Sequence, residues 1–444
     1  MPRSTATVVC RSAVLVLAAA ALAGCSVARV ESAGEDVDLT RAAVEIPEAR
    51  LLDVGVIEFA PGIEEDNEPE ETGVYPEIRR AEARYFAYHL KNTLQRTGYW
   101  GAVRVLPSRE VYTDLYVTGE IRESDGHTVE LEVVAFDATG REWMDRRYKA
   151  RMVGADYAQN RDRRNDPYQN VYNEIANDLK ALLDELSAEE VGRIRSVAEL
   201  RFMEDVAPRV YDDYLAETDR GRYEIRRLPA ENDPMLRRLR QVRERDNLFV
   251  DTLNEHYANF YYGIAIPYEG WRKAAREQAV TYREMRRSAL IRGLAGIVVV
   301  AGAATMNTDS DSGTARRTKR ALQSFAIHGG LEVIGSAFRR NAEARLHKES
   351  IRELADSFNS EAAPMVVTVK GQTRRLTGTA EAQYEQWRRL LHEIYEAETG
   401  FPEDLQVGAP SRAVSSKGLS KELSQESSQE SSQESSAESS GPSG

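Results

Sequence analysis

The stretch LLDVGVIEF at residues 51–59 decides the fold, because it is an apolar run that ends at Pro61-Gly62 and is typical of a buried strand. Beyond an acidic loop, Pro76 stands where a helix would begin, and Gly98 is a residue type that commonly ends one. Between them, residues that share one helical face recur: Ile78, Tyr85, Phe86, His89, Leu90 and Leu94. A buried strand followed by an amphipathic helix is therefore expected.

Four further strands are predicted after this helix, at residues 102–106, 114–121, 128–136 and 142–152. Turn-forming residues separate the last three of them. The order of strand, helix, strand and then a meander predicts an α+β module at 47–152, with the helix covering one face of the sheet.

Four segments give this module its likeness to a known family: VGVIEF at 54–59, RTGYW at 96–100, TDLYVTGEI at 113–121 and VELEVVAFDATG at 129–140. The module resembles the amino-terminal domain of TolB and its relatives, which include the curli-secretion lipoprotein and the lipoprotein activators of penicillin-binding proteins. The likeness covers roughly a quarter of the chain and contains no catalytic motif. It implies a binding module. No repeat that could form the propeller of TolB is present, so the function of TolB itself is not implied.

The first residues have the pattern of a secretion signal. Arg3 and Arg11 precede a short apolar core that ends in Leu22-Ala23-Gly24-Cys25. Residues 1–24 are therefore interpreted as a signal peptide, too short to span a bilayer. The tetrad LAGC resembles the bacterial lipobox, which implies that Cys25 becomes the lipidated first residue of the mature chain, carrying acyl chains such as palmitate.

Ser26, rather than aspartate, follows that cysteine. By the same resemblance, this sorts the protein to the outer membrane, with the body facing the periplasm. An ordinary signal peptide with an incidental cysteine is the alternative. Residues 25–46 are small and polar and are expected to act as a tether.

A helical body is expected at 156–290, as a bundle of antiparallel helices. Ser187 and Glu190 have the spacing of a capping box. Asp233-Pro234 predicts the start of a long helix, and Pro267 is expected to break it.

A glycine-rich apolar helical hairpin is predicted at 291–360. Its first run, 293–306, has no charge, and we expect Gly293, Gly296 and Gly302 to lie at close helix–helix contacts. Three placements are open: a buried core hairpin, a contact with another copy or with the membrane surface, and a membrane span, for which the run is short.

The chain then contains a predicted β-hairpin plus helix at 364–402, with the turn at Lys370-Gly371 and Thr379 as a helix cap. The Ser/Gln/Glu repeats of 410–444 predict a disordered tail. The fold class is therefore α+β: a small amino-terminal module, a mainly helical body, and a short carboxyl-terminal β-hairpin and helix.

Known catalytic and metal-binding patterns are not found in the sequence. Its six histidines are not paired at ligand spacing, and His392-Glu393 begins an HExxH pattern that Glu396 interrupts. No GxSxG elbow, P-loop or GxGxxG is present. We therefore expect no catalytic residue, no metal site and no cofactor. The formal net charge of −13 argues against a nucleic-acid partner.

One aromatic group is a candidate for partner binding: Tyr257, Phe260, Tyr261, Tyr262 and Trp271. Such side chains often anchor protein interfaces. Their helical spacing equally suits a core between helices, and both interpretations are open.

These observations predict a non-catalytic, lipid-anchored protein of the cell envelope, acting as a scaffold or assembly component that binds other envelope proteins at the outer membrane. The alternative is a subunit of an oligomeric outer-membrane secretion channel or pore, as a homo-oligomer. An envelope hydrolase is a third hypothesis, supported only by scattered carboxylates.

Overall fold

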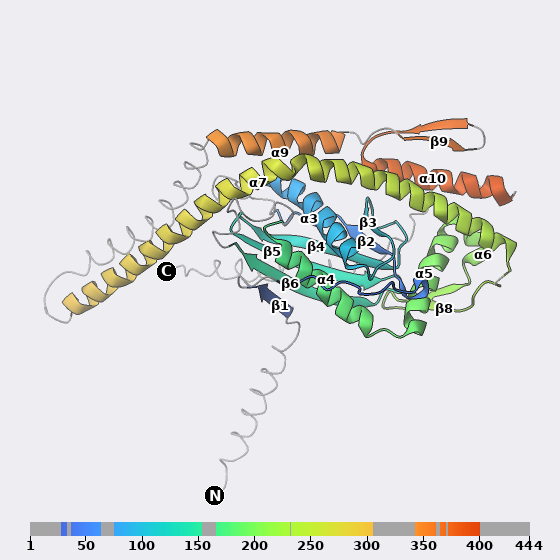
Figure 1. The fold of residues 1–444 in the computed structure, drawn as a ribbon, viewed down its shortest axis with the longest axis horizontal. Coiled ribbons are helices and arrows are strands. Elements are labelled where there is room, and N and C mark those ends of the chain that lie inside the picture. The colour runs from blue at the N-terminus through green and yellow to red at the C-terminus, as the bar shows by residue number, and fades with distance from the viewer. Residues whose placement is uncertain are drawn as a thin grey trace, which may run out of the picture.

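The structure, a computed structural model, describes residues 28–32, 37–63, 75–152, 166–230, 232–304, 342–360, 365–369 and 372–399. The predicted signal peptide with Cys25 and Ser26, residues 305–341 of the predicted helical hairpin and the predicted tail at 410–444 lie outside these ranges. Within them, helices and strands combine in mixed sheets, which confirms the α+β class (Figure 1).

A six-stranded sheet in the order β1-β6-β5-β4-β2-β3 is the centre of the fold. Strand β2 is parallel to β3 and β4, the strands β4, β5 and β6 form an antiparallel meander, and β1 is parallel to β6. The strands are β1 (Ala28–Ser32), β2 (Val54–Ile57), β3 (Val103–Leu106), β4 (Leu115–Ser124), β5 (Thr128–Asp137) and β6 (Glu142–Arg151). The predicted sheet is confirmed, except that β1 was not expected.

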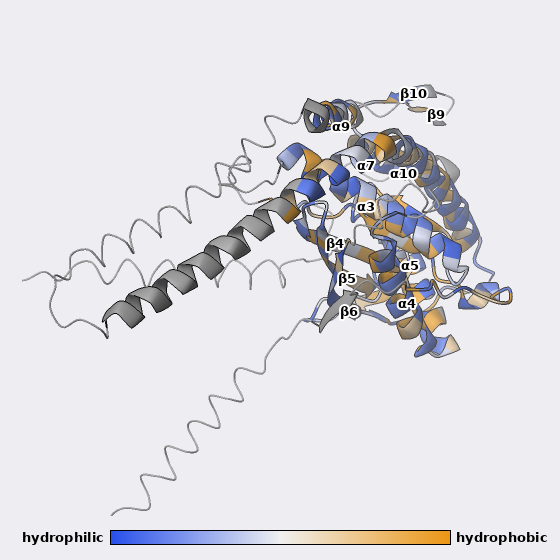
Figure 2. Cartoon of the chain, turned by 60° about the vertical axis from the view of Figure 1, so that its left-hand side comes forward, coloured by the Kyte–Doolittle hydropathy of each residue, from blue (hydrophilic) through white to orange (hydrophobic). Residues whose placement is uncertain are grey.

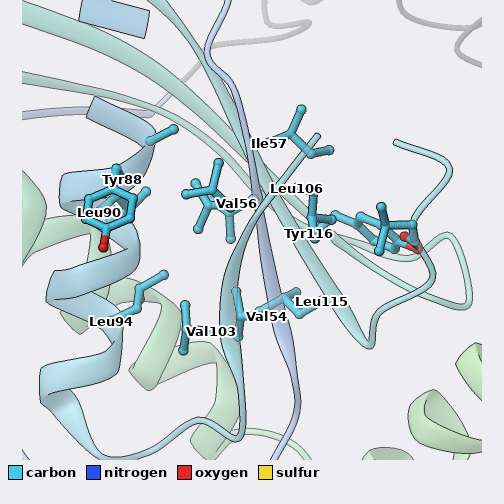
Figure 3. Close-up of a cluster of buried hydrophobic side chains, with 14 of the residues drawn as sticks. Val54, Val56, Ile57, Tyr88, Leu90, Leu94, Val103, Leu106, Leu115 and Tyr116 are labelled. Atoms are coloured by element: carbon cyan, nitrogen blue, oxygen red, sulfur yellow. Dashed lines mark hydrogen bonds between the residues drawn. The ribbon is translucent and has the colours of Figure 1, made fainter. Parts of the chain in front are cut away.

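Helix α3 (Pro76–Thr97) covers one face of this sheet, as the sequence predicts. Proline occupies its first turn, and Gly98 ends it with a left-handed backbone at φ 72°. Leu90 and Leu94 are fully buried between the helix and strands β2 and β3 (Figure 3). The helix is thereby fixed across the strands from which the module is built.

The opposite face of the meander is polar, because antiparallel strands can leave one face to solvent. Glu132 of β5 accepts hydrogen bonds from Arg122 of β4 and Arg147 of β6, each at 2.9 Å. Lys149 Nζ donates to Glu123 Oε2 and to Glu130 Oε2, each at 2.6 Å. These ion pairs cross all three strands of the meander.

Helices α4 (Gln169–Asp184) and α5 (Ala188–Val206) follow the module. Helix α4 packs on α3 and β6, next to β1 at the sheet edge. The capping box at the start of α5 is confirmed, because Ser187 and Glu190 exchange both hydrogen bonds. A single turn, α6 (Pro208–Tyr211), leads to a small hairpin of β7 (Leu215–Glu217) and β8 (Tyr223–Ile225).

Helix α7 (Pro234–Ala304) begins at Pro234 as predicted but does not end at Pro267. The expected break was wrong. An internal proline costs about 3 kcal/mol, but Ile264 before it and Tyr268 and Trp271 after it are all buried against the rest of the fold. Packing on both sides of the proline therefore holds the helix continuous.

The carboxyl-terminal elements are helix α9 (Ala342–Ser360), a hairpin of β9 (Met365–Val369) and β10 (Gln372–Leu376), and helix α10 (Ala380–Thr399). The hairpin and final helix are confirmed, and the N–H of Ala382 donates to Thr379 Oγ1 at 3.2 Å, as a cap requires. Helices α9 and α10 both pack against α7. Hydrophilic and hydrophobic residues alternate along α5 and α7, the pattern of helices with one packed face (Figure 2).

The structure bears on two sequence-based expectations, a membrane-spanning segment and a flexible tether. Among the helices that the structure describes, none combines the length and hydropathy needed to cross a bilayer. The expected tether at 25–46 is only partly correct, because residues 28–32 form β1, residues 37–40 are hydrogen-bonded to α4 and Ala42 is hydrogen-bonded to the end of α3. The sequence pattern did not reveal this, since backbone atoms of the segment make those contacts.

Candidate functional site

The densest group of buried ionisable side chains lies where α7 crosses α3. We call it the polar cluster; its members are Glu82, Tyr85, His89, Asp166, Tyr261, Tyr268 and Arg272. The members on α3 are three and four residues apart, and those on α7 are seven and four apart, so each set lies on one helical face. The two faces meet, and Asp166, which precedes α4, completes the group.

Asp166 and Arg272 form the central ion pair of the polar cluster. Arg272 Nη1 donates to both carboxylate oxygens of Asp166, at 3.1 and 3.0 Å, and the side chains are only 3% and 2% exposed. Tyr85 donates its hydroxyl to Asp166 Oδ2 at 2.8 Å, and the N–H of Tyr168 donates to Oδ1 at 2.8 Å. Burial acts to raise the pKa of Asp166, but the guanidinium of Arg272 and these hydrogen bonds outweigh it and leave the pKa below its ordinary value.

Aromatic rings surround the guanidinium of this pair. The Arg272 guanidinium carbon lies 4.3 Å from the ring centre of Tyr268, and the ring of Tyr85 stacks on Tyr261 at 4.7 Å. A cation over an aromatic face is stabilised further when water is excluded. The surroundings therefore favour the charged pair in a buried place.

Glu82 is fully buried on the sheet side of the polar cluster. Its Oε1 accepts hydrogen bonds from Ser124 at 2.6 Å and Tyr268 at 2.8 Å. Its Oε2 has no hydrogen-bond partner among the described residues, and Arg79 Nε is 3.7 Å away. Burial raises the pKa of Glu82 above its ordinary value, against Arg79 and the two hydroxyl donors, which lower it.

His89 links the polar cluster to α4. Its Nε2 lies 3.0 Å from Gln169 Oε1 and its Nδ1 lies 2.7 Å from the Tyr261 hydroxyl. Because Gln169 Nε2 donates to Asn173 and Thr93, its Oε1 is an acceptor, so His89 Nε2 carries the proton and Nδ1 accepts from Tyr261. Burial lowers the pKa of His89, which keeps the ring neutral.

A histidine, a tyrosine and a carboxylate of this kind could move protons in an open cleft. Here Asp166 is bound by two side chains and one backbone N–H, and both ring nitrogens of His89 have partners within the fold. The arrangement therefore holds α7 on the module. Its contribution is large, because removing one partner of a buried ion pair destabilises a fold by about 3–5 kcal/mol.

A second group of contacts, partly buried, fixes the carboxyl-terminal helix. Arg388 of α10 donates to both oxygens of Asp205, at 3.0 and 2.8 Å, and also to Glu110. The adjacent Trp387 donates its Nε1–H to Asp246 Oδ1 at 3.0 Å. Burial raises the pKa of Asp246 to about 6, although the bond from Trp387 acts to lower it.

The five aromatic candidates for partner binding do not share one environment. Tyr257, Phe260 and Trp271 are buried, and Tyr261 is half-buried within the polar cluster. Tyr262 is 66% exposed. One turn further along α7, Ile266 is 80% exposed, so these two side chains present an apolar pair to solvent.

The predicted helix-contact residues Gly293, Gly296 and Gly302 belong to the last part of α7. Their surroundings lie outside what the structure describes, as do Cys25 and Ser26. Those expectations therefore stay predictions.

The sequence interpretation missed Asp166, Arg272 and Glu82. A pattern was available for Glu82, because it falls on the apolar face of α3, four residues after Ile78 and three before Tyr85. A charged residue at such a position needs a buried partner. Asp166 had no comparable pattern, since the segment before α4 has no periodicity.

Within the described ranges, no group of three or more histidine, cysteine, aspartate or glutamate side chains could hold a metal ion. No protein-family model matches the chain, and comparisons with curated proteins and with solved structures found no significant match.

Proposed function

We propose that this protein is a non-catalytic, lipid-anchored scaffold of the cell envelope that binds other envelope proteins at the outer membrane. The observation that carries the proposal is the sequence Leu22-Ala23-Gly24-Cys25 after a charged and then apolar start. Acyl chains on Cys25 would anchor the protein, and two or more chains are needed for stable attachment.

The buried contacts support a binding role over a chemical one. Hydrogen bonds between members of the polar cluster, together with the bond of His89 to Gln169, join α3, α4 and α7. The same holds for the contacts of Arg388, which join α10 to α5. A framework fixed in this way can present surfaces without changing shape, and rigid partners lose less entropy on binding.

Two surfaces are available to a partner protein. One is the polar face of the meander, where Arg122, Glu132 and Arg147 alternate in charge. The other is the apolar pair of Tyr262 and Ile266 on α7. Charge complementarity favours specificity at the first surface, and apolar burial favours affinity at the second.

Anchoring is tested by fractionation of Cys25→Ser cells. The variant is expected in the soluble periplasmic fraction, because the acyl chains are lost. A variant that still sediments with outer membranes after a salt wash would show that lipid is not the anchor.

Partner binding is tested by a photo-crosslinking residue at Ile266 or, in a second strain, at Arg122, in intact envelopes. One discrete adduct with another protein at one site but not the other would identify the binding surface. Adducts at neither site would contradict the scaffold proposal on these surfaces.

The alternative is a subunit of a secretion channel, which the likeness of residues 54–140 to the curli-secretion lipoprotein favours. A channel requires a closed ring of identical subunits. Sedimentation of the detergent-extracted protein separates the two: a ring of fixed subunit number supports the channel, and a monomer supports the scaffold.

A further inference from the structure

The segment that follows the predicted lipid anchor is bound to helix α4 by a row of asparagines. Asn170, Asn173 and Asn177 lie three and four residues apart, on one face of the helix. Asn170 Oδ1 accepts from the N–H of Val37 at 3.2 Å, and Asn173 Nδ2 donates to the carbonyl oxygen of Val37 at 2.6 Å. Both backbone polar groups of Val37 are thus bound by α4.

The same row continues toward the module. Asn177 Nδ2 donates to the carbonyl oxygen of Asp38 at 2.9 Å, and its Oδ1 accepts from the N–H of Thr40 at 2.9 Å. The N–H of Ala42 then donates to the carbonyl oxygen of Thr97 at the end of α3, at 2.8 Å. All of these bonds engage the backbone of the segment, so they fix its path whatever its side chains are.

Strand β1 fixes the part of the chain that lies still closer to the anchor. It pairs with β6 in parallel, with Ala28 opposite Arg146 and Ser32 opposite Ala150. The chain therefore enters β1 from the side on which β6 begins, at Glu142. The attachment point of the anchor is thereby placed at the β1 edge of the sheet.

The distance from Cys25 to this edge is short. Only three residue steps separate Cys25 from Ala28, and three residues span at most about 10 Å. A flexible tether of 22 residues, as expected from the sequence at 25–46, would allow a typical separation of roughly 26 Å. Chain connectivity alone therefore limits how far a lipid on Cys25 can be attached from Ala28, well below the reach of such a tether.

The part of α7 that packs along β3 lies at the sheet edge opposite β1. Strands β1 and β3 are the two edges of the six-stranded sheet, and α7 packs along β3. Five strand spacings separate the edges, about 24 Å. Figure 1 shows the first part of α7, which packs along β3, on the opposite side of the sheet from β1.

We propose that the bilayer surface that receives the acyl chains of Cys25 is itself a binding partner of the β1–β6 edge, so that the body lies against the membrane with the part of α7 that packs along β3 directed away from it. This inference rests on the proposed lipidation. It assigns the surfaces of α7, including Tyr262 and Ile266, to a partner reached from the periplasm and not to lipid.

Spin labels on the mature, lipidated, full-length protein test the orientation. The only cysteines of the chain are Cys10, in the predicted signal peptide, and Cys25, whose thiol would carry lipid, so an introduced cysteine is labelled alone. Glu142→Cys at the start of β6 and Leu248→Cys on α7 are both at exposed positions. The protein is bound to vesicles of phosphatidylethanolamine and phosphatidylglycerol that contain a nickel-chelating lipid.

The expected result is a severalfold stronger relaxation of the label at 142 than of the label at 248, because nickel at the headgroups acts only over short distances. Equal relaxation at both sites, or stronger relaxation at 248, would overturn the orientation. If Cys25→Ser protein does not bind the vesicles while the lipidated protein does, lipid is the anchor. A failed orientation test alongside that result contradicts the orientation and not the proposed function.

A linker variant provides the matched control. Insertion of a flexible Gly/Ser segment of 20 residues after Val27 leaves every described contact of the fold in place but lengthens the connection. The difference between the labels at 142 and 248 should then disappear, while vesicle binding remains. Thr40→Pro, which removes the N–H bound by Asn177, should reduce the difference in part. A difference that persists unchanged with the linker would mean that the short connection is not its cause.

Discussion

The side-chain amide of Asn254 pairs with the backbone of Val105 as a neighbouring strand would. Its Oδ1 accepts from the N–H of Val105 at 2.8 Å, and its Nδ2 donates to the Val105 carbonyl oxygen at 2.9 Å. Val105 lies on β3, an edge of the sheet, and Asn254 lies on α7. An exposed edge strand is a template for aggregation. The long helix therefore closes this edge with one side chain, assisted by Asp251, which binds Arg104 at 2.7 and 3.0 Å.

Asn254→Ala should destabilise the protein by about 1–3 kcal/mol, because two backbone groups of Val105 lose their partner. Urea unfolding measures this loss. Asn254→Asp keeps the acceptor for the Val105 N–H but replaces the donor with a second acceptor beside the carbonyl, so it should destabilise at least as much above the aspartate pKa. A stability unchanged in both variants would mean that solvent satisfies this edge.

Arg272→Met should cost about 3–5 kcal/mol, since it leaves Asp166 charged and buried without its cation. The double variant Asp166→Leu with Arg272→Met removes both charges and should recover much of the loss. Unfolding free energies of the two single variants and the double variant give the coupling directly. Additive losses would contradict a direct interaction between the two side chains.

Asp246→Asn should become more stabilising, relative to wild type, as the pH rises. Burial raises the pKa of Asp246 to about 6 from an ordinary 3.8. The folded state therefore binds this proton more tightly than the unfolded state, and stability is lost as the pH rises from about 4 to about 6. This pH-dependent loss of folding stability amounts to roughly 3 kcal/mol. The Asp246→Asn variant avoids the loss because asparagine does not ionise, and its side-chain oxygen can still accept the hydrogen bond from Trp387.

Unfolding at pH 4, 5, 6 and 7 measures this difference, with Glu244→Gln at an exposed position of the same helix as the control for a lost surface charge. Burial also raises the pKa of Asp114 to about 6, so part of the wild-type slope remains in the variant. A constant difference between variant and wild type from pH 4 to 7 would show that Asp246 does not titrate in this range.

Gly126→Ala should destabilise the contact between the β4–β5 turn and α7. Gly126 has φ +77°, and a Cβ there would lie 2.3 Å from the carbonyl oxygen of Arg272 and 2.8 Å from the N–H nitrogen of Arg276. The left-handed backbone alone costs alanine roughly 1–2 kcal/mol, and the helix must also move away. Thermal melting measures the loss.

Gly192→Ala is the matched control for this substitution. Gly192 lies inside α5, and nothing is within 4 Å of its added Cβ. Alanine should therefore stabilise the protein by roughly 0.5–1 kcal/mol through helix propensity. Equal effects of the two substitutions would rule out the close approach of the turn to α7.

The sequence by itself determined the elements whose physics is local. The run at 51–59, the helix between Pro76 and Gly98, the meander, the Ser187 capping box and the final hairpin all follow from periodicity and turn chemistry over a few residues. The resemblance of Leu22-Ala23-Gly24-Cys25 to a lipobox likewise rests on neighbouring residues alone. Each of these features depends on contacts within about ten positions of the chain.

The tertiary structure alone decided the features that join distant residues. Pro267 stays within α7 because buried residues on both sides of it outweigh a local preference. Residues 37–40 look like a tether because they bind α4 through their backbone atoms, which have no sequence pattern. Asp166 and Arg272 are 106 positions apart, and a buried ion pair is favourable only where both partners lose water together. No local sequence pattern can predict such a pair, because the desolvation cost and the attraction between the charges both arise only when the distant segments pack together.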